Sequence, residues 1–149
     1  MQPGRRILLK LIALAGAAFA VPRRLFAAWP ERAFAAEKAA DALSALAPGV
    51  TPKPSDRLRL KVPLIAENGA LVPVTVSTDI ENVSRIAVII DKNPNPLAAA
   101  FELTPASIPE IALRFKMNET SAVMAVVEAD GEIYTASQEV KVTLRGCGG

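Results

Sequence analysis

The sequence predicts an all-β domain that follows a short helix and ends in a glycine-rich arm. From residue 57 onward, apolar and polar residues alternate with a period of two, which is typical of half-buried strands. Seven or eight such segments follow one another in roughly 90 residues, separated by turn signals. The sequence has no βαβ rhythm and no glycine-rich phosphate loop after a strand. These features favour an immunoglobulin-like antiparallel β-sandwich, with a small β-barrel as the competing architecture.

The size and composition of the chain fit one domain and exclude several kinds of site. The 149 residues are 51% hydrophobic and 21% charged, which excludes a disordered chain. There is no histidine and one cysteine. Histidine-ligated zinc or haem, a Ser-His-Asp triad, a Cys-His dyad, a CxxC pair and an intramolecular disulfide are therefore all excluded.

The first 35 residues have the pattern of an export signal. Arg5 and Arg6 precede a moderately apolar run that ends at Val21, which is typical of a twin-arginine leader and predicts a periplasmic protein. The run has about 15 residues and contains Lys10, whereas a membrane-spanning helix needs about 20 apolar residues. We therefore expect no permanent membrane span.

Two small-x-small triplets are candidate cleavage sites for this leader. A cut after Ala35, in Ala33-Phe34-Ala35, is the first choice, and Ala18-Phe19-Ala20 is the alternative. Removing residues 1–35 takes away six cations and one anion, leaving 11 cations, 14 anions and a net charge of −3. Such an acidic chain, with only three aromatic residues, is not expected to bind nucleic acid.

The mature chain is expected to open with a helix. Glu37–Ala47 is rich in good helix formers and is followed by Pro48-Gly49 as a stop, and Val50–Asp56 is a connector. Asn68-Gly69 and Asp130-Gly131 are turn signals, and Pro73 is expected at an edge or a bulge because it cannot donate to a ladder. The expected strands are Arg57–Val62, Leu71–Thr78, Arg85–Ile90, Ala98–Leu103, Ile111–Met117, Val123–Glu128, Glu132–Ala136 and Val140–Leu144.

The sequence offers no set of catalytic or metal-binding residues. Glu67, Asp91 and Glu128 adjoin strands or turns and are expected to be solvated surface groups. The segment Lys92–Pro96, with two prolines, is either a rigid connector or a recognition loop for a partner, and the sequence does not decide between them.

The last four residues, Gly146-Cys147-Gly148-Gly149, carry the most specific signal in the chain. Cysteine usually ranks among the most buried residues, yet Cys147 lies at a chain end between glycines that add no side chains. In an oxidising compartment an unpaired thiol is a liability unless it is used. We therefore expect a mobile arm that presents Cys147 to partner enzymes.

Three other interpretations of this terminus stay open. The cysteine can form an intermolecular disulfide, so that the chain is an exported immunoglobulin-like interaction module that dimerises through Cys147. It can also be an incidental tail residue. Finally, the carboxylate of Gly148-Gly149 can be the working group, as in ubiquitin-like sulfur carriers, although those carriers work in the cytoplasm.

The sequence resembles the SoxY family, the sulfur-carrier subunit of the periplasmic thiosulfate-oxidising multienzyme system. The resemblance covers most of the mature chain and is strongest in the terminal motif. The motifs that carry it, beside the leader, are Ile65–Gly69, Val72–Val74, Lys92–Pro96, Arg114–Met117 and Gly146–Gly149. The family usually ends in Gly-Gly-Cys-Gly-Gly, whereas position 145 here is arginine, which shortens the arm by one glycine and places a cation near the thiol.

The resemblance implies a non-catalytic carrier subunit without a resident cofactor. Cys147 is then the covalent attachment point for sulfur intermediates, as an S-thiosulfonate or a persulfide. A haem enzyme loads thiosulfate, a manganese-dependent hydrolase releases sulfate, and a sulfur dehydrogenase, where present, oxidises the remaining sulfur. A small β-sandwich subunit, SoxZ, is the heterodimer partner. The expected organisation is a leader (1–35), a helix and connector (36–56), a β-sandwich carrier domain (57–145) and a swinging arm (146–149).

Overall fold

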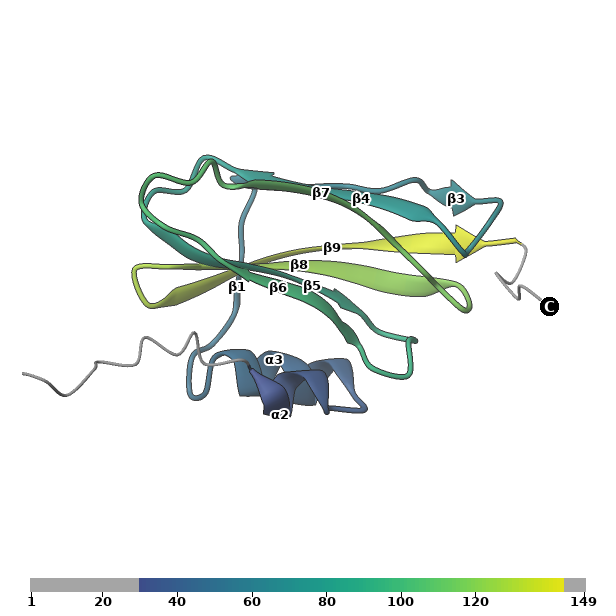
Figure 1. The fold of residues 1–149 in the computed structure, drawn as a ribbon, viewed down its shortest axis with the longest axis horizontal. Coiled ribbons are helices and arrows are strands. Elements are labelled where there is room, and N and C mark those ends of the chain that lie inside the picture. The colour runs from purple at the N-terminus through teal and green to yellow at the C-terminus, as the bar shows by residue number, and fades with distance from the viewer. Residues whose placement is uncertain (1–29, 144–149) are drawn as a thin grey trace, which may run out of the picture.

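The computed structural model describes residues 30–143, which form three layers (Figure 1). Two helices, α2 (Glu31–Phe34) and α3 (Ala39–Leu46), cover one face of a six-stranded sheet, and a three-stranded sheet covers its other face. The larger sheet has the order β1-β9-β8-β5-β6, with β3 also paired to β9, and the smaller has the order β2-β4-β7. The strands are β1 (Lys53–Pro54), β2 (Leu58–Lys61), β3 (Ile65–Ala66), β4 (Val72–Thr78), β5 (Val83–Ile90), β6 (Leu97–Glu102), β7 (Glu110–Phe115), β8 (Ser121–Ala129) and β9 (Glu132–Val142).

The main core lies between the two sheets. Strand β4 sends every second residue inward, and β5 and β8 do the same from the facing sheet, as the period-two pattern predicts. The antiparallel β-sandwich expected from the sequence is thereby confirmed. The buried residues of this core are Leu58, Ala66, Val72, Val74, Val76, Ile86, Val88, Ile90, Met117, Val123, Ala125, Val127 and Val140.

A second core lies between the larger sheet and the helices. Ala87 and Ile89 alternate with the inward residues of β5 and pack under the helical layer. Because β5 is covered on both faces, its sequence is a nearly continuous apolar run instead of an alternating one. The buried residues of this second core are Ala33, Ala42, Leu46, Ala87, Ile89, Leu97, Val126 and Ile133.

The last two strands expected from the sequence are one strand. The prediction of separate strands over Glu132–Ala136 and Val140–Leu144 is wrong, because β9 runs without interruption from Glu132 to Val142. Its polar middle residues pair with β8, with Ser137 opposite Met124 and Glu139 opposite Ala122. Their polarity reflects exposure of this part of the strand and does not mark a break.

The two turn signals have different outcomes. Asp130 and Gly131 adopt positive φ angles of 52° and 76° and join β8 directly to β9, as a two-residue hairpin requires. Asn68 instead accepts a hydrogen bond from Ala70 N (2.8 Å), and the short strand β3 separates β2 from β4. Pro73 lies on the central strand of the smaller sheet, opposite Arg114 on β7 and beyond the last pair with β2, which is at Thr75; the expected edge position is therefore found only on the β2 side.

Within the described residues, the longest helix has 8 residues, and none of the helices there is long and apolar enough to cross a membrane. Export of the chain stays a prediction.

Candidate functional site

The predicted attachment residue, Cys147, lies outside the described residues. The same is true of the arm glycines Gly146, Gly148 and Gly149 and of the leader residues Arg5 and Arg6. The structure does describe the strand that leads to the arm, as far as Thr143. The candidate site is therefore built here from the base of the arm.

The final residues of β9 are held from both sides. On one side, Lys141 N donates to Leu64 O (2.9 Å) and Thr143 N donates to Ala66 O (3.1 Å), because β3 pairs parallel to β9. On the other side, Val142 N donates to the Thr120 hydroxyl (3.0 Å). Three consecutive backbone N–H groups are thus bonded where a terminal strand would otherwise fray.

The core beneath this strand end is fully packed. Val140 and Met117 are completely buried, and Ala66 is nearly so. Met117 N also donates to Gly69 O (2.7 Å), which fixes the segment that follows β3 against the end of β7. The base of the arm is therefore a rigid part of the sandwich.

Cys147 is the fourth residue after Thr143 in the sequence. Since an extended residue spans at most about 3.3–3.6 Å, the Cα atom of Cys147 can lie no more than roughly 14 Å from this anchored end. The sequence predicts a final strand that ends at Leu144; β9 ends at Val142, and the last backbone hydrogen bond in the described residues is that of Thr143 N.

An exposed apolar surface lies beside the arm base. The side chains of Leu64 and Ile65 are 70% and 58% exposed, although both are large aliphatic residues. Together with Gln138, Glu139 and Lys141 they line a shallow depression of about 440 Å³. Sequence analysis missed this surface, because a two-residue strand such as β3 leaves no periodic signal.

The comparisons with known proteins match the β-sandwich, and the family match continues as far as Cys147. The family model of the sulfur oxidation protein SoxY matches residues 44–147, which include Cys147. The solved structure of the sulfur carrier protein SoxY from Chlorobium limicola f thiosulfatophilum is 40% identical, covers 72% of this chain and 97% of its own, and superimposes with a TM-score of 0.67. The chain belongs to the SoxY family.

A second solved structure shows the fold alone. Superoxide reductase (neelaredoxin) from Ignicoccus hospitalis is 14% identical, with 61% of this chain and 94% of that chain covered and a TM-score of 0.54. The search of curated proteins found no match.

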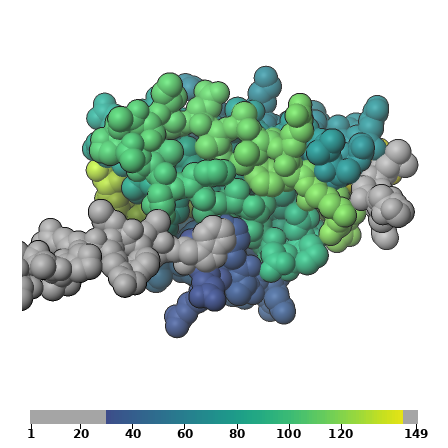
Figure 2. All heavy atoms as spheres, in the orientation of Figure 1, coloured from purple at the N-terminus to yellow at the C-terminus, as the bar shows by residue number. Residues whose placement is uncertain are grey.

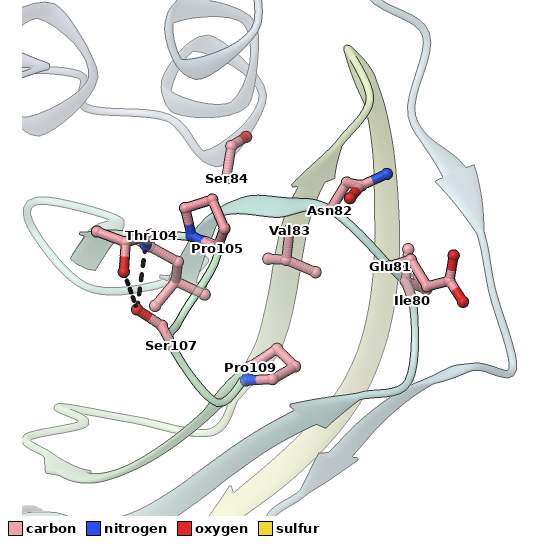
Figure 3. A pocket seen from close by; sticks show the side chains of 10 residues that line it. Ile80, Glu81, Asn82, Val83, Ser84, Thr104, Pro105, Ser107 and Pro109 are labelled. Carbon is pink, nitrogen blue, oxygen red and sulfur yellow. Dashed lines mark hydrogen bonds between the residues drawn. The ribbon is translucent and has the colours of Figure 1, made fainter.

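A larger depression in this SoxY-family domain lies away from the arm base. It has a volume of about 500 Å³ and lies between the segment before β5 and the β6–β7 connector (Figure 3). Val83 on its wall pairs with Ala129 beside the β8–β9 hairpin, so it is at the opposite end of β9 from Thr143. Glu81 is the one carboxylate in its lining, and no cluster of three metal-binding side chains occurs among residues 30–143.

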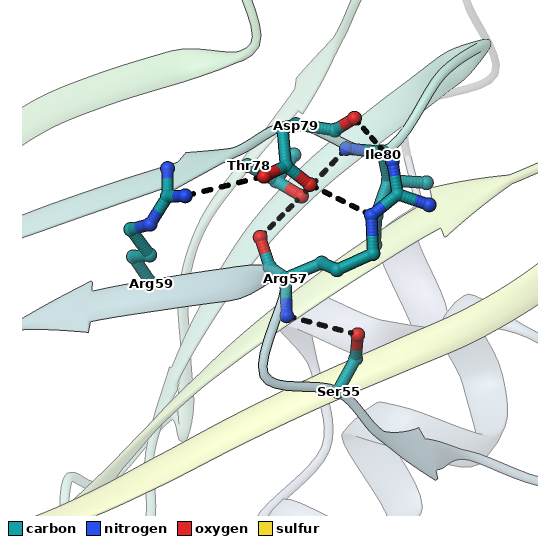
Figure 4. A network of polar contacts seen from close by, with 6 residues as sticks. All are labelled: Ser55, Arg57, Arg59, Thr78, Asp79 and Ile80. Carbon is teal, nitrogen blue, oxygen red and sulfur yellow. Dashed lines mark hydrogen bonds and ion pairs between the residues drawn. The ribbon is translucent and has the colours of Figure 1, made fainter.

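A polar network joins β2 to the end of β4 (Figure 4). Asp79 accepts from Arg57 Nε (2.7 Å) and from an Arg59 guanidinium nitrogen (3.1 Å). The hydrogen bond from Arg57 is the main reason that the pKa of Asp79 lies below its usual range. The Thr78 hydroxyl donates to Arg57 O (2.9 Å) and accepts from Ile80 N (3.1 Å). This network lies where β2 begins and β4 ends, and it joins these two strands.

The carboxylates singled out in the sequence do not form a site. Glu67 and Asp91 are exposed, as expected. Glu128 differs from the expectation, because it is only partly exposed and pairs with Arg85 at 3.0 Å. Arg85 also pairs with Glu102 at 2.7 Å and donates to Leu46 O (2.9 Å), so this cluster joins the sheet to α3.

The segment Lys92–Pro96 is fixed at several points. Lys92 N donates to the Ser121 hydroxyl (3.0 Å), the Asn93 amide donates to Lys116 O (2.8 Å), and the Asn95 amide donates to Phe34 O (3.0 Å). These bonds favour the rigid connector over a loose loop. Because Ser121 pairs with Val140, the connector lies at the same end of the sandwich as the arm base, and a recognition role stays a prediction.

Proposed function

We propose that this chain is a periplasmic sulfur carrier that holds thiosulfate-derived sulfur on Cys147 while partner enzymes act on it. The single observation that carries the proposal is the family match, which continues to Cys147 itself and covers the strand that precedes it. The hydrogen bonds around residues 141–143 support it, because they give a short thiol-bearing tail a fixed point of attachment. The solved relative, at 40% identity, is itself named a sulfur carrier protein.

The chemistry at Cys147 balances if the enzymes supply the redox steps. A haem enzyme of the loading step removes two electrons and joins the Cys147 thiolate to the outer sulfur of thiosulfate, forming an S–S bond. A manganese-dependent hydrolase then adds water to the terminal sulfone group, which leaves as sulfate with two protons and leaves a persulfide on Cys147. A sulfur dehydrogenase, where present, removes six electrons from that outer sulfur, while three water molecules supply the oxygen atoms of a new sulfonate group and release six protons. In these reactions the chain itself contributes the sulfur atom of Cys147 and presents it to the enzymes.

The partners follow from the same proposal. A carrier whose intermediates are formed and removed by other proteins must be visited by several enzymes. An arm reaching roughly 14 Å from a rigid base suits entry into their clefts. The heterodimer partner is a SoxZ-like small β-sandwich subunit. Export folded by the twin-arginine route allows such a leaderless partner to travel with this chain.

The experiment that tests the proposal is reconstitution of thiosulfate oxidation with purified partner enzymes. Cys147→Ser is expected to abolish turnover while leaving the unfolding transition unchanged. Ser137→Ala, an exposed strand position, is the matched control and is expected to support full turnover. Turnover by Cys147→Ser would refute the carrier role.

A non-reducing electrophoresis of native extract separates this proposal from the alternative. A carrier is expected to migrate mainly at the size of one chain. Quantitative disulfide-linked dimer would instead favour the interaction module that dimerises through Cys147.

A further inference from the structure

We propose that the export leader is cut on the N-terminal side of Pro30, so that the segment before α3 stays in the mature protein as part of its folded helical layer. This inference rests on the proposed export. It reverses the first choice made from the sequence, a cut after Ala35, which would remove all of α2.

The first argument is the burial of the triplet Ala33-Phe34-Ala35. Ala33 is completely buried and lies in the second core with Ala42, Leu46 and Leu97. Phe34 packs against the same cluster from the side. The helical layer lies directly against the strands in the space-filling view (Figure 2). A cut after Ala35 would therefore remove part of a packed core, which a leader peptide does not normally contribute.

The second argument is the hydrogen bonding of the same segment. The Asn95 side-chain amide donates to Phe34 O (3.0 Å), which joins α2 to the Lys92–Pro96 connector 61 residues further along the chain. Ala33 N and Phe34 N donate to Pro30 O (3.0 and 3.1 Å), and Ala35 N donates to Glu31 O (2.9 Å). The backbone groups of this triplet thus take part in the hydrogen bonds of α2 and in the bond with Asn95.

These contacts decide between two triplets that the sequence cannot distinguish. Both candidate sites read Ala-Phe-Ala, and both satisfy the small-x-small rule. A peptidase needs an accessible, extended stretch, and cutting a folded segment first requires local opening. A twin-arginine passenger is folded before it is processed, so the buried triplet is protected. Ala18-Phe19-Ala20 is the candidate that remains, and it lies outside the described residues.

The reaction is hydrolysis of one peptide bond with one water molecule. Water adds across the Ala20–Val21 bond, giving a carboxylate on the leader and a new amino terminus at Val21. The mature chain then keeps 15 residues that a cut after Ala35 would remove.

The test is amino-terminal sequencing and intact-mass analysis of the full chain expressed with its leader and recovered from the periplasm. A wild-type amino terminus before Pro30 is the expected result. An amino terminus at Glu31 or any later residue, or an uncut chain that begins at Met1, would overturn the inference. The same mass spectrum reports any adduct on Cys147, so failure of the carrier role is recorded separately from failure of the processing site.

Two matched variants place a bulky residue at the position before each candidate cut. Ala35→Leu is expected to mature like the wild type, since Ala35 is exposed in the fold and its substitution does not disturb the core. Ala20→Leu is expected to accumulate as precursor at least tenfold over wild type. Accumulation of Ala35→Leu precursor, or normal maturation of Ala20→Leu, would contradict the proposal.

Discussion

Asp79 is a charged residue that links β4 to the chain at β2. It accepts hydrogen bonds from Arg57 and Arg59, and its pKa is held below the usual value chiefly by the bond from Arg57. A carboxylate whose pKa is depressed in the folded state stabilises the fold above its unfolded pKa of about 3.9, and this contribution is lost as the pH falls through the folded value.

Asp79→Asn is therefore expected to lower the urea midpoint at pH 7 and to make no difference once the pH is below the folded pKa of Asp79. The measurement is a series of urea titrations of both proteins between pH 7 and pH 2. Glu119→Gln, at an exposed carboxylate between β7 and β8, is the control. Parallel pH profiles for wild type and Asp79→Asn would contradict the assigned role.

Gly131 supplies a positive φ angle in the turn that joins β8 to β9. Its φ of 76° is unfavourable for residues with a Cβ, while an added Cβ would meet nothing within 4 Å. Gly131→Ala is therefore expected to lower the free energy of unfolding by about 1 kcal/mol through backbone strain alone. Ser137→Ala, an exposed position on β9, is the control. An unchanged midpoint for Gly131→Ala in urea titration would refute the argument.

These two residues differ in how far the sequence predicts them. Asp130-Gly131 is a local signal, because the required backbone angles depend only on adjacent residues. The contacts of Asp79 with Arg57 and Arg59 are separated by 22 and 20 residues and depend on strand register. No local pattern contains that information.

Among the elements, α2 is the one whose contribution is least visible in the sequence. It has four residues, and its role comes from packing Ala33 into the second core and from the contact of Phe34 with Asn95. The helix expected over Glu37–Ala47 is confirmed as α3, but its place over β5 could be known only from the burial of both faces of that strand.

Comparison of two purified chains, one beginning at Val21 and one at Ala36, tests the contribution of α2. The shorter chain is expected to be less stable by about 2 kcal/mol, because it exposes apolar surface of α3 and β6. Urea unfolding at neutral pH measures the difference. Equal stability would mean that residues 30–35 are not part of the cooperative fold.

At the scale of the whole molecule, the sandwich has two distinct ends. The arm base lies at the end of β9 together with β3, Thr120 and the Lys92–Pro96 connector. The larger depression lies at the opposite end. The sequence predicted the sandwich from its alternation and the working thiol from its terminal motif. It did not predict the hydrogen bonds that hold the end of β9, because they come from the two-residue strand β3 and the hydroxyl of Thr120.

The requirement that the thiol lie beyond the hydrogen-bonded end of β9 is itself testable. A double variant, Cys147→Ser with Thr143→Cys, keeps one thiol but moves it to the anchored strand, where Thr143 N bonds to Ala66 O. It is expected to lose at least a hundredfold in reconstituted thiosulfate oxidation, because the thiol cannot enter a partner's cleft. Gly148→Cys with Cys147→Ser, which keeps the thiol on the arm, is the control and is expected to retain more activity than the Thr143 variant. Equal activity of the two variants would contradict the claim that the thiol must extend beyond the folded domain to work.

The most direct measurement is the mass of the protein recovered from the periplasm of cells oxidising thiosulfate. The carrier account predicts species heavier than the free chain by a thiosulfonate or by sulfur, with the addition located on Cys147 and removed by a reductant. A single unmodified mass under the same conditions, from cells that are consuming thiosulfate, would contradict it.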